Sequence, residues 1–87
     1  MARYLVELYV SRTGAGGLDE AAARARAAAA EELSREGVAV RYLRSIFIPA
    51  DETWFLLYEA ASAKAVEDAV ARAALPCERV LEAVTQP

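Results

Sequence analysis

The stretch RYLRSIFIPADETWFLLYEAAS, residues 41–62, decides the fold because it predicts two β-strands joined by a short polar turn. Residues 38–48 and 53–59 are rich in β-branched and aromatic side chains, which suit a pleated sheet. Pro49 and the Ala-Asp-Glu sequence after it are typical of a turn. Arg44 interrupts this otherwise apolar run, so the sequence raises the question of whether it belongs to a site.

A strand and a long helix are predicted upstream of this hairpin. Residues 3–10 alternate β-branched and aromatic types and predict the strand. The alanine-rich residues 19–36 predict the helix, with Asp19 as its N-cap and Gly37 just beyond its end. Because most of this helix is alanine, we expect its buried face to consist of alanine plus Leu33.

A second helix and a last strand are predicted downstream. Ser62 is a favourable N-cap for a helix over residues 62–74, and Pro76 prevents the helix from continuing. Val66, Ala69, Val70 and Ala73 recur at the spacing of one buried stripe. Residues 78–84 predict a strand, and residues 85–87 predict a tail.

This order of elements, β-α-β-β-α-β, predicts a ferredoxin-like α+β sandwich formed by residues 1–87 as one domain. We expect one antiparallel sheet in which the four strands, numbered along the chain, lie in the order 4-1-3-2. Two short helices cover only one face of such a sheet. The other face is therefore left open.

Alternation along the strands predicts which side chains occupy each face of the sheet. The residues assigned to the helix side are Tyr4, Val6, Leu8, Leu43, Phe55, Leu57, Leu81 and Ala83. The residues assigned to the open side are Leu5, Glu7, Tyr9, Tyr42, Arg44, Ile46, Trp54, Leu56, Tyr58, Val80, Glu82 and Val84. A β-bulge in residues 38–48 would invert part of this assignment.

Composition excludes several classes of partner. The formal net charge is −3, from 10 Lys and Arg against 13 Asp and Glu, and no basic run reaches five residues. We therefore expect no nucleic-acid partner. No apolar stretch reaches about 18 residues, so we expect no membrane-spanning helix. The N-terminus lacks the pattern of a signal peptide and Cys77 is the only cysteine, which favours a cytoplasmic location.

The chain contains no histidine, which excludes the usual Ser-His-Asp and Cys-His arrangements and removes the commonest transition-metal ligand. We therefore assign no catalytic residue, no metal ligand and no cofactor. The sequence GAGG at residues 14–17 lacks the spacing of a nucleotide-binding loop and predicts a flexible connection. Cys77, at a helix–strand junction, is interpreted as a residue without a chemical role.

The open side combines apolar side chains with three charges, which suits a partner sheet or a ligand pocket. Arg44 either binds an anionic ligand, pairs with Glu7 or Glu82, or lies exposed on an edge strand. Glu7 and Glu82 are expected to be close, either as an acid/base couple, as a weak site for a hard cation, or neutralised by an arginine. The candidate ligand-binding residues are Arg44, Glu7, Tyr42, Trp54, Leu56, Tyr58 and Glu82.

Several segments, among them VRYLRS, PADET, YEAAS and ALPCERVLEAV, resemble a family of small bacterial proteins of unknown function described as nickel-binding-protein-like. The resemblance covers nearly the whole chain. It implies a ferredoxin-like fold and dimerisation through the open sheet face. Members often have histidine at the position matching Arg44 and cysteine at that matching Leu56. Because both are missing here, the family's nickel site is not expected in this chain.

The sequence leads to one functional expectation and two alternatives. The first is a small-molecule binding or interaction domain that forms a homodimer, a dimeric α/β barrel, and holds an anionic ligand on its open face. The second is a cofactor-free enzyme of the monooxygenase or isomerase kind, with Glu7 or Glu82 as acid/base. The third is nickel binding as in the resembled family.

Overall fold

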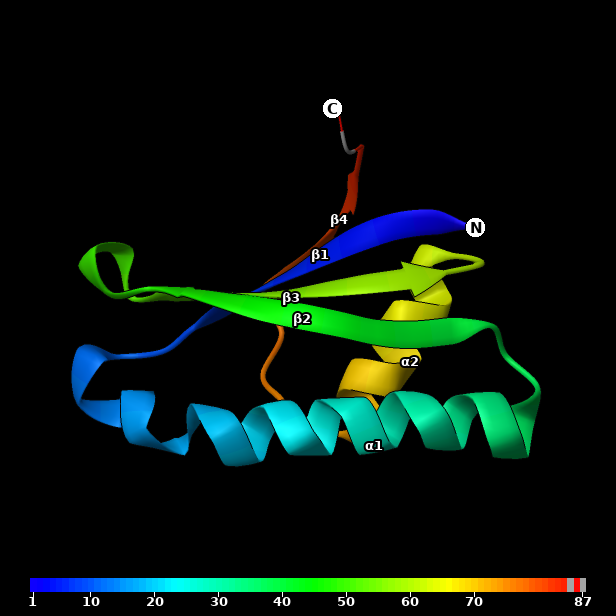
Figure 1. The fold of residues 1–87 in the computed structure, drawn as a ribbon, viewed down its shortest axis with the longest axis horizontal. Coiled ribbons are helices and arrows are strands. Elements are labelled where there is room, and N and C mark those ends of the chain that lie inside the picture. Colours follow the sequence, from blue (N-terminus) through cyan, green and yellow to red (C-terminus); the bar gives the residue numbers. More distant parts are fainter. Residues whose placement is uncertain (85, 87) are drawn as a thin grey trace.

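In the computed structural model, which describes residues 1–84 and 86, the strands form one antiparallel sheet in the order β2-β3-β1-β4 (Figure 1). The elements in chain order are β1 (Ala2–Tyr9), α1 (Leu18–Glu36), β2 (Val40–Ile48), β3 (Thr53–Ala60), α2 (Ala63–Arg72) and β4 (Arg79–Ala83). This is the predicted α+β ferredoxin-like arrangement, with element ends within two residues of prediction. The predicted tail at 85–87 lies mostly outside the described residues.

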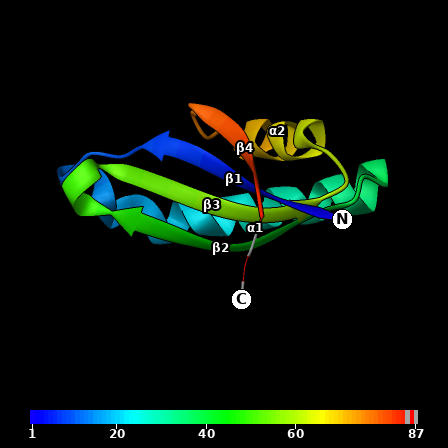
Figure 2. The same ribbon diagram turned by 90° about the horizontal axis from the view of Figure 1, so that it is seen from above.

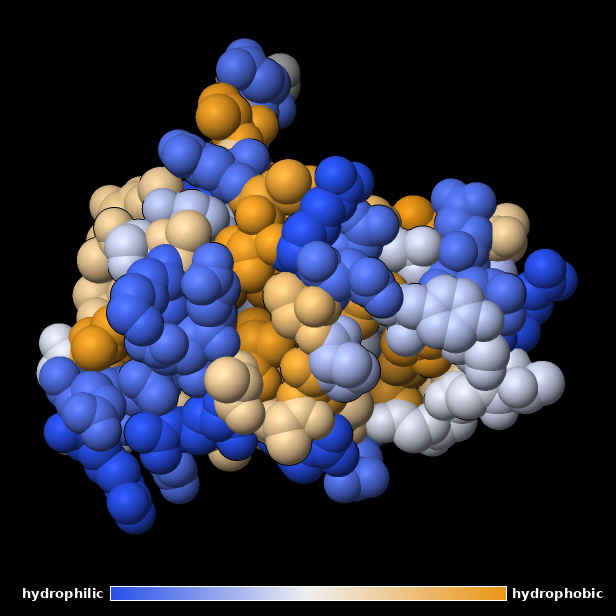
Figure 3. All heavy atoms as spheres, turned by 180° about the vertical axis from the view of Figure 1, so that it is seen from behind, coloured by the Kyte–Doolittle hydropathy of each residue, from blue (hydrophilic) through white to orange (hydrophobic). Residues whose placement is uncertain are grey.

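Both helices lie against the same face of the sheet, and the opposite face is uncovered (Figures 1 and 2). The core between the two layers contains Tyr4, Val6, Leu8, Ala25, Ala29, Val40, Tyr42, Trp54, Leu56, Tyr58, Ala60, Ala65, Val66, Ala69 and Val70. On the side of the molecule that carries α2 and β4, hydrophobic residues also reach the surface between hydrophilic ones (Figure 3). The buried stripe predicted for α2, from Val66 to Ala73, is confirmed.

The helix ends follow from local hydrogen bonds. The Ser62 hydroxyl accepts a hydrogen bond from the Ala65 amide at 3.2 Å, as an N-cap does. Gly37 ends α1 with a φ of 66°, a conformation that favours glycine. Asp19 is not the N-cap that we predicted, because α1 begins one residue earlier; it lies in the first turn, where a carboxylate is favoured by the helix dipole.

Residues 14–17, predicted as a flexible connection, belong instead to a short 3₁₀ helix, Arg12–Gly17, which leads into α1. Its first turn is held by the Ser11 hydroxyl, which accepts a hydrogen bond from the Gly14 amide at 3.1 Å. A second 3₁₀ turn, Pro49–Asp51, joins β2 to β3 at the predicted position of the turn. Both connections are thus regular pieces of structure.

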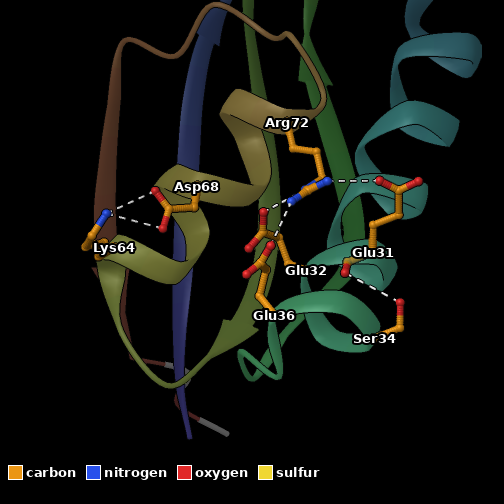
Figure 4. Close-up of polar contacts among 7 residues, drawn as sticks. All are labelled: Glu31, Glu32, Ser34, Glu36, Lys64, Asp68 and Arg72. Carbon is orange, nitrogen blue, oxygen red and sulfur yellow. Dashed lines mark hydrogen bonds and ion pairs between the residues drawn. The ribbon is translucent and has the colours of Figure 1, made fainter.

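The buried face of α1 is made of Ala25, Ala28 and Ala29, as predicted, but its fourth member is Glu32 and not Leu33, which is 53% exposed. Burial of a carboxylate is costly unless it is paired. Arg72 of α2 provides the partner, because its Nε donates a hydrogen bond to Glu32 Oε1 at 2.7 Å (Figure 4). This hydrogen bond raises the pKa of the Arg72 guanidinium above its ordinary value.

The same guanidinium reaches two more glutamates of α1. Its Nη1 donates to Glu31 at 3.1 Å, and its Nη2 lies 3.7 Å from Glu36 (Figure 4). One arginine of α2 therefore contacts three carboxylates on the neighbouring helix. This cluster fixes how the two helices lie against each other, since a charged, planar fork has few favourable orientations.

The facing that we predicted for β3 and β4 is wrong. Tyr4 pairs with Tyr58, Val6 with Leu56 and Leu8 with Trp54, and all six are buried against the helices. In β4, Val80 packs against the core and Glu82 pairs with Tyr4, so both belong to the helix side. The side chains that replace them on the open face are Phe55, Leu57, Leu81 and Ala83. Predicted alternation failed here because both faces of β3 are apolar, so polarity does not distinguish them.

A β-bulge in β2 splits the strand into two segments of opposite phase. Tyr42 pairs with Tyr58 and Arg44 with the next residue of β3, Leu57, so Leu43 is the extra residue. Tyr42 is consequently buried on the helix side, where it contacts the Tyr58 ring edge-on and the Arg26 guanidinium at 5.2 Å. The predicted open-side position of Tyr42 is wrong, whereas those of Arg44 and Ile46 are correct.

Tyr58 is fully buried, and its hydroxyl has no hydrogen-bond partner among the described residues. An unsatisfied buried hydroxyl costs about 1–3 kcal/mol. We therefore predict that Tyr58→Phe leaves stability unchanged or raises the free energy of unfolding by about 1 kcal/mol, measured by urea denaturation. Tyr4→Phe, which changes another core tyrosine of the same face, is the control. A loss of more than about 1 kcal/mol in Tyr58→Phe would show that the hydroxyl is bonded in solution.

Candidate functional site

The open face of the sheet is arranged in cross-strand rows, because the registers of the three strand pairs coincide. The first row contains Arg44, Leu57, Leu5 and Leu81, and the second contains Ile46, Phe55, Glu7 and Arg79. The third contains Arg41, Glu59, Arg3 and Ala83, and a fourth contains Ile48, Thr53 and Tyr9. We call the first the leucine row, since it runs from Arg44 on one edge strand across three leucines to the other edge.

Five apolar side chains, Leu5, Ile46, Phe55, Leu57 and Leu81, form a contiguous group in the first two rows, which we call the open-face patch. Ile46 is 54% exposed and Leu81 is 38% exposed, while the other three are half-buried by their neighbours. Monomeric proteins seldom expose large contiguous apolar patches without a function. The patch is therefore the first feature of the candidate site.

Arg44 stands at the edge of this patch because of the bulge at Leu43. In a regular strand, residues three apart point to opposite faces, so Arg41 and Arg44 would be separated by the sheet. The extra residue instead puts both on the open face, in adjacent rows. Bulges commonly redirect a side chain beside a functional site. Arg44 is exposed, and within residues 1–84 and 86 it has neither an ion-pair partner within 4.0 Å nor a hydrogen bond.

The other open-face arginines are already engaged. Glu59 forms ion pairs with two of them: its Oε1 lies 3.4 Å from Arg41 Nη2, and its Oε2 lies 4.0 Å from Arg3 Nε. Arg79 donates a hydrogen bond from Nε to Glu7 Oε1 at 2.6 Å. The described strands thus present four arginines and two glutamates on the open face, a surplus of two positive charges, although the chain has a net charge of −3.

Of the predicted site residues, Arg44 and Glu7 lie on the open face, in neighbouring rows on different strands. The other five do not join them, because Tyr42, Trp54, Leu56, Tyr58 and Glu82 all lie on the helix side. Glu7 and Glu82, expected to be close, are on opposite faces of the sheet. They therefore form neither the acid/base couple nor the cation site that the sequence suggested.

Sequence reasoning missed Arg41, Phe55, Leu57 and Leu81 as members of the open face. The spacing of Arg41 and Arg44 carries no signal by itself, because two residues three positions apart share a face only if the strand is bulged. Alternation alone does not locate a bulge within residues 38–48, and the structure places it at Leu43. Once it is placed there, Arg41 and Arg44 fall together on the open face.

Two other features of the surface offer little chemistry. A hollow of about 370 Å³ at the end of the sheet is lined by Glu7, Leu8, Tyr9, Thr53, Glu78 and Arg79. Its arginine is the one already paired with Glu7. Cys77 is exposed as a residue, yet partial burial of its thiol and then Glu67 and Glu78 raise its pKa, which disfavours the reactive thiolate.

Comparison with known proteins agrees with this fold. A sequence model described as "Nickel responsive protein SCO4226-like" matches residues 9–83, most of the chain. The chain belongs to the SCO4226-like family. This confirms the resemblance noted from the sequence, and the family is one of unknown function.

A solved structure supports the same fold. The crystal structure of SCO4226 from Streptomyces coelicolor A3(2) superposes with a TM-score of 0.80 over 99% of this chain and 100% of that chain, at 21% identity. This likeness establishes the fold and nothing further. No curated protein matches the chain in sequence. In the described part of the chain, neither helix is long and apolar enough to cross a membrane.

Proposed function

We propose that this member of the SCO4226-like family is a homodimeric binding protein that holds a small anionic ligand between two open sheet faces. The observation that carries the proposal is the combination of the open-face patch with Arg44, an arginine for which the described structure supplies no acceptor. Small-molecule sites combine a mostly apolar lining with a few placed polar groups.

A second copy of the chain is the best occupant for most of the open face. Burial of apolar surface is worth on the order of 25 cal/mol per Å². A domain of 87 residues buries a limited core of its own, so added burial through association is a substantial gain. Two copies related by a two-fold axis present the same patch to each other, which makes a self-complementary contact. Such packing corresponds to a dimeric α/β barrel.

The charges explain why an anion would accompany the dimer. Each open face has a surplus of two positive charges, so two facing copies bring together a surplus of four. Removing unpaired charge from water is costly unless an opposite charge compensates it. Arginine keeps its charge under all ordinary conditions and binds carboxylate or phosphate oxygens in bidentate fashion. An anionic ligand at Arg44 supplies the missing acceptor.

Nickel, which the family description mentions, does not fit the residues present. Nickel favours imidazole and thiolate donors, and the chain has no histidine and only Cys77 as a thiol. No group of three or more Cys, Asp or Glu residues within the described chain is arranged to hold a metal. Arg44 and Leu56 also lie on opposite faces of the sheet, so these two positions do not form one site here.

We predict that the protein is a dimer in solution and that Ile46→Asp converts it to a monomer of about 9.4 kDa. An aspartate at Ile46, on the edge strand β2 but within the open-face patch, would place a carboxylate in an apolar contact. Light scattering at micromolar concentration, with circular dichroism to verify folding, is the measurement. Leu33→Asp is the matched control, because Leu33 on α1 is equally exposed but lies on the helix side. A wild-type monomer, or equal effects of both substitutions, would contradict the proposal.

We further predict that the protein purified without added ligand retains a small anion, visible by native mass spectrometry as added mass on the dimer. Arg44→Gln should lose this mass, because glutamine has no charge to hold the anion. Arg35→Gln, at an exposed arginine of α1, should keep it. Retention by Arg44→Gln would place the anion elsewhere.

For nickel we predict no stoichiometric, sub-micromolar binding by tag-free protein in calorimetry. The physical reason is the lack of imidazole donors together with the positive charge of Arg44, which repels a divalent cation. Arg44→His tests the location, since it removes the charge and supplies one imidazole on the open face. Tight binding by the wild-type chain would mean that oxygen donors of the open face form a site that we have not recognised.

A further inference from the structure

The leucine row has a definite polarity, which restricts the ligand that rests on it. One end is Arg44, and the rest of the row is Leu57, Leu5 and Leu81, each directly paired with the next across the sheet. No second charge interrupts the row. A ligand that lies along it therefore meets one cation and then only apolar side chains.

The neighbouring rows flank the leucine row, which is the track that the ligand would follow. On one side lie Ile46 and Phe55, followed by Glu7 and Arg79, which neutralise each other at 2.6 Å. On the other side, Glu59 engages Arg41 and Arg3, and the row ends in Ala83. The Arg44 end of the leucine row is thus positive, because Arg44 adds to the surplus charge of the Arg41–Glu59–Arg3 group. The Leu81 end of the row is apolar.

The length of the leucine row follows from the number of strands that it crosses and from the spacing between them. It crosses four strands, β2, β3, β1 and β4, which means three interstrand steps. Neighbouring strands lie about 4.8 Å apart, so the distance from the first strand to the last is about 14 Å. This length suits a medium-length hydrocarbon chain.

Resting on the proposed function, we propose that the ligand is a monocarboxylate with an unbranched apolar chain, its carboxylate on Arg44 and its chain along the leucine row. On the leucine row itself, a second charge of the ligand would lie against Leu57, Leu5 or Leu81 and would meet no charged side chain. A small hydrophilic anion would bind Arg44 without contacting the leucines, so the row would add nothing to its binding. An uncharged chain would leave Arg44 without an acceptor.

The test is calorimetry of the tag-free dimer with four probes: decanoate, hexanoate, decanol and succinate, each at concentrations where it is monomeric in water. Decanoate should bind most tightly. Decanol, which lacks the carboxylate, should bind at least about tenfold more weakly, because a charge-assisted bidentate pair is lost. Hexanoate should bind more weakly than decanoate because it covers less of the row.

Two variants locate the ends of the ligand. Arg44→Gln should reduce decanoate affinity by at least about tenfold while leaving decanol unchanged, and Arg35→Gln should change neither. Leu81→Ser, at the far end of the row, should weaken decanoate but not hexanoate, whose chain stops short of β4. Circular dichroism melts identify any variant that fails to fold, and the chain-length series on the wild-type protein does not depend on the variants.

The outcomes separate this inference from the proposed function. Equal affinity for decanoate and decanol, or for decanoate in wild type and Arg44→Gln, would overturn the carboxylate at Arg44. Arg44-dependent binding of succinate without binding of decanoate would overturn the apolar chain and leave the proposed anion site in place. No binding of any probe to a protein that is a dimer by light scattering would overturn the ligand class but not the assembly.

Discussion

Two helices cannot cover both faces of a four-stranded sheet, and the rest of this molecule depends on that constraint. α1 and α2 both lie on one side, so every apolar side chain of the other side must remain in water or find a partner. The uncovered side carries an apolar group in its centre and arginines toward its margins. Its composition is intermediate between a core and a solvated surface, as expected of a face that is covered by something else.

The bulge at Leu43 determines what that face can do. One extra residue lets β2 bury Tyr42 toward the helices and then present Arg44 and Ile46 toward the open side. A regular strand would have placed Arg44 among the core residues, where its charge would require a buried partner. The chain instead keeps an apolar core and has on its open face a guanidinium for which the described residues supply no partner. The fold and the candidate site thus share one local irregularity of the backbone.

The order of elements could be predicted from the sequence because its signals are local: Ser62 as a cap, Gly37 at a helix end, and Pro49 in the turn. The facing of β3 could not, since Phe55 and Leu57 are as apolar as Trp54, Leu56 and Tyr58. Only pairing with β1 decides between these sets, and pairing is a property of the folded sheet. The predicted facing of Trp54 and Tyr58 is wrong for this reason, whereas that of Tyr42 is wrong because the bulge at Leu43 puts it out of phase with Arg44. Glu32 was missed as a buried residue because its partner, Arg72, lies on another helix.

The distribution of charge has a consequence for how two copies approach each other. Four arginines and two glutamates on the open face leave six basic and eleven acidic residues elsewhere, so each molecule is an electric dipole with its positive end at the sheet. Two such dipoles brought face to face oppose each other at long range. Dissolved ions screen this repulsion over about 10 Å at 0.1 M salt. Association through the open face would therefore be faster in salt than in dilute buffer, the reverse of the usual behaviour of electrostatically steered partners.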